Sequence, residues 1–146
     1  MRRFIVLCCA LAGGTTAMAQ ANDTMAIKQL LEKESSTWRS GAVKEHAACW
    51  FIQPYSKILV STPEGKCFDI SPRLMVHPAE GMMGKGGTSI NSNYRFSIHG
   101  HYGWVSHDEK SIAKDGTASY SHEIRMLEKI KGQWKLVGQS IHVYVP

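Results

Sequence analysis

Histidines that could carry acid–base or metal chemistry gather in the second half of the chain. Five of the seven histidines lie in the strand region predicted there, at His99, His101, His107, His122 and His142. Imidazole changes charge near neutral pH and ligates metals, so histidines on neighbouring strands could form a site together with Glu109 or Glu123. We take His107 and His122 as the candidate catalytic residues.

Strand register decides whether these histidines meet. His107, His122 and His142 fall on successive predicted strands, but a shift of one residue turns a side chain to the other face of a sheet. The alternative is that they are scattered on the surface or hydrogen-bonded in the core. Spacing alone therefore leaves catalysis open, and we predict neither a metal site nor a cofactor.

Aromatic side chains could line a pocket beside the histidines, because aromatic residues are common in ligand-binding walls. Simple core packing is the alternative for each of them. The predicted pocket residues are Trp38, Trp50, Tyr55, Tyr94, His107, Tyr120, His122 and His142.

A glycine-rich run at residues 81–87 superficially resembles a phosphate-binding loop. The spacing does not fit, because Ala79 stands where the first glycine is needed and Gly86 follows Lys85 in place of Ser or Thr. We predict a flexible lid or a plain surface loop over residues 79–88.

The first 19 residues have the pattern of a cleaved signal peptide. Arg2 and Arg3 precede a short apolar run, and Ala17-Met18-Ala19 forms a cleavage site of the A-x-A type. The apolar run is too short to span a bilayer, which takes about 20 residues. We expect residues 20–146 to form one exported domain, periplasmic or extracellular, with no membrane span after cleavage.

The charge of the chain argues against nucleic acid as a partner. Seventeen Lys and Arg face twelve Asp and Glu, a net charge of +5. Losing Arg2 and Arg3 with the leader leaves about +3, and the basic residues never cluster. Cys49 and Cys67 survive cleavage and could pair in an oxidising compartment, or stay single thiols.

Periodicity predicts helices first and strands afterwards. Ile27, Leu31 and Trp38 fall on one helical stripe that stops at Gly41, and a shorter helix follows up to Trp50. From Tyr55 onward the period changes to two. Strands are predicted at residues 57–61, 66–70, 93–99, 104–109, 117–129 and 133–144, with a helical turn after Pro72. The order predicts an α+β domain, a cone in which a helical hairpin packs on a strongly curved antiparallel sheet.

Three sequence runs resemble one known family. They are AIKQLL leading to WRSGA over residues 26–42, HAACW at 46–50, and RMLEK followed by GQWKLV over 125–137. The chain is similar in these runs to the SnoaL-like, ketosteroid-isomerase-like branch of the nuclear transport factor 2-like superfamily. The resemblance covers most of residues 24–144 and implies the cone fold, a pocket and a homodimer formed through the sheet.

The resemblance does not extend to the isomerase mechanism. Enzymes of that type carry a general-base carboxylate on the first strand, whereas residues 58–62 read ILVST. A hydroxyl group is too weak a base to take a proton from carbon at neutral pH. Function does not follow from fold.

We therefore expect an exported domain that binds a small apolar or amphipathic molecule, without established catalysis. Two alternatives stay open. One is a histidine-dependent isomerase, hydratase or hydrolase acting in the cone pocket, and the other is a dimeric protein-interaction module.

Overall fold

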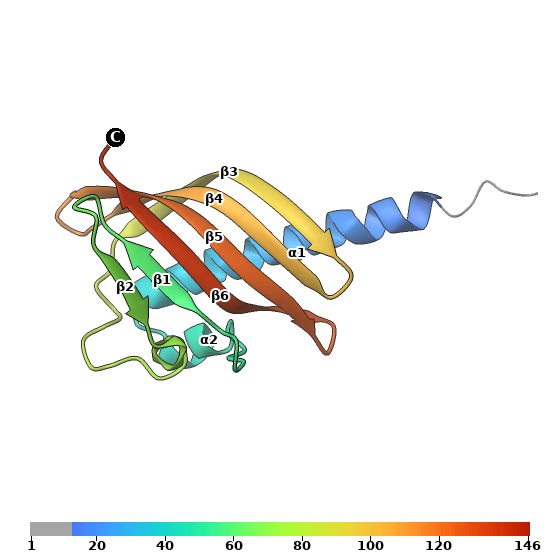
Figure 1. Ribbon diagram of the computed structural model, residues 1–146, viewed down its shortest axis with the longest axis horizontal. Coiled ribbons are helices and arrows are strands. Elements are labelled where there is room, and N and C mark those ends of the chain that lie inside the picture. Colours follow the sequence, from blue (N-terminus) through green and yellow to red (C-terminus); the bar gives the residue numbers. More distant parts are fainter. Residues whose placement is uncertain (1–12) are drawn as a thin grey trace, which may run out of the picture.

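The computed structural model describes residues 13–146, which form two α-helices, one short 3-10 helix and one six-stranded sheet (Figure 1). Helix α1 spans Gly13–Ser40 and α2 spans Val43–Ala47. The predicted α+β class and the order of helices before strands are confirmed. Of the predicted signal peptide, residues 1–12 lie outside the described residues and residues 13–19 begin α1. Within residues 13–146 no helix is both long enough and apolar enough to cross a membrane.

Helix α1 ends where the sequence predicts, at Gly41. This residue has a φ of +78°, a conformation that glycine adopts without the steric cost of a side chain. A Cβ atom at Gly41 would also lie 3.2 Å from Cα of Gly84, so the glycine lets the loop of residues 79–87 approach the helix end.

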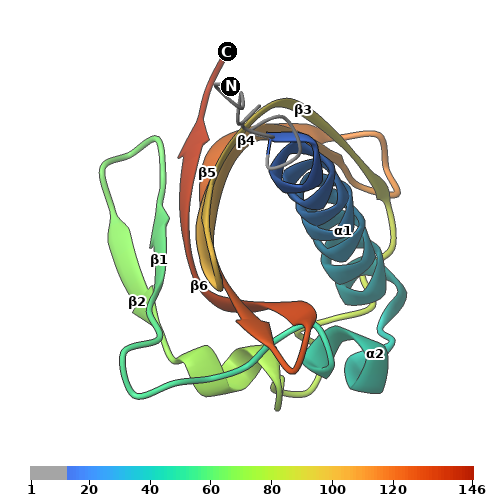
Figure 2. The ribbon, with the colours of Figure 1, turned by 90° about the vertical axis from the view of Figure 1, so that its right-hand side faces the viewer.

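The sheet combines a long antiparallel meander with a short hairpin. Its strands are β1 (Ile58–Ser61), β2 (Cys67–Ile70), β3 (Thr88–His99), β4 (Tyr102–Ile112), β5 (Ala118–Ile130) and β6 (Gln133–Tyr144). The spatial order is β2-β1-β6-β5-β4-β3, and β1 runs parallel to β6. The 3-10 helix η1 (Pro72–Met75) follows β2. Figure 2 shows the sheet curving around α1, which lies on its concave side.

Strand β3 begins earlier than the sequence pattern suggests, at Thr88 and not at residue 93. Its pairing with β4 is irregular between Ser92 and Arg95, and Asn93 takes a left-handed φ of 55°. Such an irregularity breaks the alternation of apolar and polar residues on which the prediction relied. Strand β3 therefore begins at Thr88, the last residue of the glycine-rich segment (residues 79–88) that was predicted as a loop.

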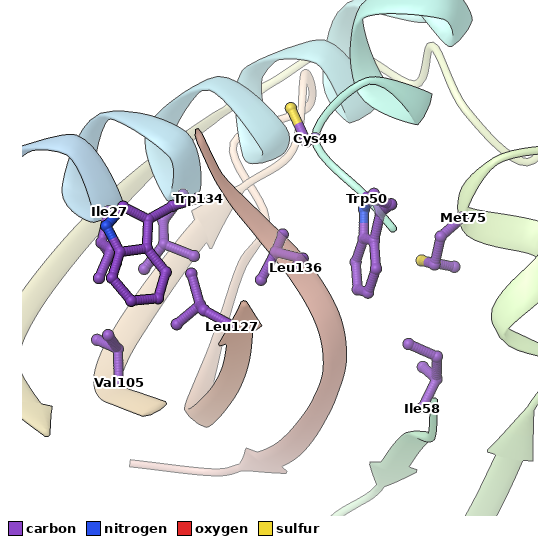
Figure 3. Packing of buried hydrophobic residues seen from close by; sticks show 10 residues of the cluster. Ile27, Cys49, Trp50, Ile58, Met75, Val105, Leu127, Trp134 and Leu136 are labelled. Atoms are coloured by element: carbon purple, nitrogen blue, oxygen red, sulfur yellow. The ribbon is translucent and has the colours of Figure 1, made fainter. Parts of the chain in front are cut away.

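The hydrophobic core lies between α1 and the concave face of the sheet. Ile27 packs there with Val105, Leu127 and Leu136, which come from three neighbouring strands (Figure 3). Trp50 lies at the wide end of the core and forms a bridge with Leu136. Fully burying one such side chain contributes about 1.5–3 kcal/mol to folding. The core therefore fixes α1 against the sheet and so positions the polar side chains beyond it.

Neither Cys49 nor Cys67 forms a disulfide in the structure. Cys49 is a buried free thiol and Cys67 is an exposed one on β2. Burial, with the charge of Glu34, raises the pKa of Cys49 to about 11, so its thiol is protonated at neutral pH. The bridge considered from the sequence is absent here, and only Cys49 fits the alternative of a buried single thiol.

Candidate functional site

A cavity of about 500 Å³ lies between the C-terminal half of α1, the concave face of the sheet and η1. The elements at one edge of the sheet, β1, β2 and the end of β6, together with η1, form a mainly apolar wall of Ile58, Val60, Ile70, Met75, Ile141 and Val143, and Trp38 and Met82 add to the apolar lining. Helix α1 with β4, β5 and the middle of β6 forms a mainly polar wall of Glu34, Ser35, Arg39, Glu109, Ser111, Ser121, Glu123, Arg125 and Gln139. A cavity of this size with one apolar and one polar side suits a small amphipathic molecule.

Strand alternation places the polar groups on the concave face. Glu123 and Arg125 are two residues apart on β5, so both point to the same side. Glu109 of β4 lies opposite Ser121, and His107 lies opposite Glu123. His107, Glu109, Glu123 and Arg125 are therefore four neighbouring charged or titratable residues that point to the concave side of the sheet, although most of the concave face is apolar.

Arg125 is the centre of a buried ion network. Its guanidinium donates to Glu123, to Gln139 and, at 3.4 Å, to Glu34 of α1. Burial alone would lower the pKa of Arg125, but Glu123 and Glu34 outweigh it and raise that pKa. Burial likewise pushes the pKa of Glu123 upward, but Arg125, with His107 and the Ser121 hydroxyl, more than reverses the effect and lowers that pKa, so Glu123 stays ionised.

A second ion pair joins the end of α1 to β4. Arg39 Nη2 donates to Glu109 Oε1 at 2.7 Å and to the Ser111 hydroxyl at 2.9 Å. Burial and the nearby charge of Glu123 raise the pKa of Glu109, although Arg39 opposes the rise. Glu109 is therefore a carboxylate on the cavity wall whose negative charge is only partly compensated.

His107 lies on the concave face but under the network, away from the cavity wall. Its side chain is 1% exposed, Nε2 is 3.5 Å from Glu123 Oε2, and the ring stacks on Tyr94 at 5.2 Å. Burial, together with the positive charge of Arg125, lowers the pKa of His107 to about 4. The imidazole is therefore uncharged at neutral pH.

The prediction that three histidines converge inside the cone is wrong. His122 lies opposite Asp108, one residue beyond the inward-facing His107, so it points to the outer face of the sheet. It is 63% exposed and its Nδ1 is 2.7 Å from Asp108 Oδ1. His142 lies beside it on the same outer face and contacts the hydroxyl of Ser61 at 2.8 Å.

The aromatic residues predicted for the pocket are divided among three places. Trp38 and Tyr120 line the cavity. Trp50 is buried in the core, and Tyr94 stacks against His107 and Phe96. Tyr55 is 62% exposed and donates a hydrogen bond to Glu128. Of the eight predicted pocket residues, two therefore line this cavity.

Sequence reasoning missed several polar residues of the cavity, above all Glu34, Arg39, Arg125 and Gln139. Glu34 lies on the same helical stripe as Ile27, Leu31 and Trp38, where a charged residue is unexpected. Glu123 and Arg125 likewise hold alternate positions on a strand whose inward residues pack against a helix. A charged residue at a position where the pattern predicts an apolar, buried one was the signal that could have identified these residues.

One group of side chains has the composition of a metal site. Ligand atoms of His107, Glu109 and Glu123 all lie within 4.8 Å of one another. Glu109 and Glu123 are each paired with a guanidinium, however, from Arg39 and Arg125. A metal ion coordinated by both carboxylates would compete with these two guanidinium groups for their oxygens, so the arrangement favours ion pairing within the protein.

The glycine-rich loop, predicted as a mobile lid or plain surface, is attached to the end of α1. The amides of Gly84 and Gly86 donate to the carbonyls of Trp38 and Arg39 at 3.0 and 2.9 Å. Residues from this loop, Met82 among them, form part of the cavity wall. The loop therefore completes the site.

Solved structures share this architecture at low sequence identity. A nuclear transport factor 2-like protein with a cystatin-like fold from Novosphingobium aromaticivorans aligns with a TM-score of 0.68 and 10% identity, covering 92% of this chain and 90% of that chain. A Streptomyces avermitilis protein of that family, provisionally described as a dehydratase, aligns with a TM-score of 0.67 and 10% identity over 86% and 99% of the two chains.

A protein of unknown function from Methylobacillus flagellatus, also nuclear transport factor 2-like, has 19% identity and a TM-score of 0.60, over 85% and 94% of the two chains. No protein-family model and no curated protein matches the sequence. The chain thus has the nuclear transport factor 2-like fold, and the predicted fold is confirmed.

Proposed function

We propose that this protein binds a small amphipathic molecule in the cavity between α1 and the sheet. The observation that carries the proposal is the division of the cavity into an apolar wall and a charged wall. An apolar body would be removed from water by residues such as Val60 and Ile141, at about 25 cal/mol per Å² of buried surface. Polar groups of the ligand would meet Glu109 and its neighbours, which fix orientation. Export to the periplasm or the cell exterior stays a prediction from residues 1–19.

Filling the cavity is expected to abolish ligand binding. Ile141 lines the apolar wall, so Ile141→Trp places an indole ring in the space that a ligand needs. We expect compounds found to bind the wild type in a thermal-shift and calorimetric screen of amphipathic molecules to lose about tenfold or more in affinity.

His142→Trp is the matched control, because the neighbouring residue on β6 points to the outer face of the sheet. It should bind the same compounds as the wild type. Equal affinity of the wild type and Ile141→Trp for these compounds would show that they bind outside the cavity and would contradict the proposal.

An acid–base enzyme is a second candidate, but with a different residue from those predicted. His122 is on the outer face, and His107 is shielded from the cavity by the ion network. Glu109 is a carboxyl group that lines the cavity and has a raised pKa, as general acids and bases often do. An activity would therefore depend on Glu109.

The predicted homodimer is also proposed here, supported by an apolar row on the outer face of the sheet. Trp104 lies opposite Met126, with Ile124 next to it on the same face, and all three are exposed. We expect sedimentation velocity to give a dimer for the wild type and a monomer for Trp104→Glu. Phe68→Glu is the control. Phe68 is an exposed aromatic residue that pairs with Val60, so it lies on the concave face of the sheet and not on the outer face. A monomeric wild type would contradict the dimer.

A further inference from the structure

Most guanidinium donors of the cavity's charged wall are already used within the protein. The four terminal N–H groups of Arg39 point to the Ser35 carbonyl, the Ser35 hydroxyl, Glu109 and Ser111. Arg125 donates to Glu34, Glu123 and Gln139, and its Nε is fully buried, out of reach of a ligand. A ligand carboxylate would therefore have to compete with these internal partners for both guanidinium groups.

Acceptors, by contrast, are in excess on the same wall. Glu109 accepts one hydrogen bond at each oxygen, from Arg39 and, at 3.4 Å, from Ser35. A carboxylate has about four lone-pair sites, so about half of those on Glu109 are unused. Because Glu109 also lines the cavity, its unused acceptor sites face the place where a ligand would lie.

The buried charged residues of the same wall include more negative than positive groups. Three carboxylates, Glu34, Glu109 and Glu123, face two guanidinium groups, Arg39 and Arg125. His107 beside them is neutral at pH 7 and adds no positive charge. Lys85 also lines the cavity, but it is an exposed residue, so water screens its charge. The buried residues alone carry one uncompensated negative charge, which is more effective in a cavity of low polarity than it would be in water.

We propose that the cavity selects small amphipathic amines, whose ammonium group donates hydrogen bonds to Glu109 while the apolar body packs on Val60 and Ile141. An ammonium has three donors and no acceptor, so it complements a wall that is rich in acceptors and poor in free donors. The positive charge also cancels the excess negative charge. This inference rests on the proposed function, because it requires the cavity to bind a ligand.

Three probes with the same ring system separate the polar group from the apolar body. They are 2-(1-naphthyl)ethylamine, 2-(1-naphthyl)ethanol and 1-naphthylacetate, titrated into the full protein by isothermal calorimetry at pH 7. We expect the amine to bind about tenfold or more tightly than the alcohol, and the carboxylate most weakly, as charged hydrogen bonds predict.

Two isosteric variants test whether Glu109 causes the preference for the amine. Glu109→Gln should remove the preference for the amine, whereas Asp108→Asn, which removes the neighbouring negative charge on the outer face, should retain it. Alcohol or carboxylate binding as tight as that of the amine would overturn the inference and leave the cavity proposal standing. If no probe binds the wild type better than it binds Ile141→Trp, both proposals fail.

Discussion

Replacing Arg125 with methionine is expected to lower the free energy of unfolding by about 3–5 kcal/mol, the usual cost of removing one partner from a buried ion pair. Methionine fills a similar length but leaves Glu34 and Glu123 buried without their counter-charge. Urea denaturation followed by tryptophan fluorescence measures the change.

The control for this prediction is Arg95→Met, the same substitution at an exposed position of β3. It should change stability by no more than about 0.5 kcal/mol. Adding Glu123→Gln to Arg125→Met should recover part of the loss, because it removes one of the two orphaned charges. A loss in Arg125→Met no larger than that in Arg95→Met would show that the network does not stabilise the fold.

Stability is also expected to fall as the pH decreases from about 6.5 to about 4, by about 3 kcal/mol through His107 alone. The folded state lowers the pKa of His107 to about 4 from the ordinary value of 6.5. Between these values the unfolded chain binds a proton that the folded protein does not, so acid favours unfolding. Above 6.5 the ring is neutral in both states, and below 4 it is protonated in both.

His107→Phe tests this prediction, because phenylalanine keeps the stacking on Tyr94 but has no titratable group. The loss of stability between pH 7 and pH 4.5 should be smaller in this variant than in the wild type. Glu109 contributes with the opposite sign, since its pKa is raised, but it does so in both proteins. His122→Phe, at an exposed site, should leave the wild-type loss unchanged. An equal loss in His107→Phe would refute the role of His107.

The sequence predicts the fold well because the fold depends on long local patterns. The stripe through Ile27, Leu31 and Trp38 identifies α1, and Gly41 marks its end. Alternation identifies β5 and β6 nearly to their final residues. The start of β3 was missed because the irregular pairing near Asn93 and the nearby glycines hide the alternation.

The site was predicted much less well, for reasons of register and long-range pairing. Whether His107 and His122 share a face depends on which residue of β4 lies opposite which residue of β5. Their opposite orientations follow from that pairing, which no local pattern determines. The contact between Glu34 and Arg125 joins residues 91 positions apart, so composition and spacing could not reveal it.

Ligand binding in the cavity is tested most directly by native mass spectrometry of the wild type and of Ile141→Trp after both have been incubated with a small-molecule extract of the natural host. We expect the wild type to retain a small nitrogen-containing molecule that Ile141→Trp does not. Identical spectra for the two proteins, with the same adducts or with none, would contradict the claim that this cavity is a ligand-binding site.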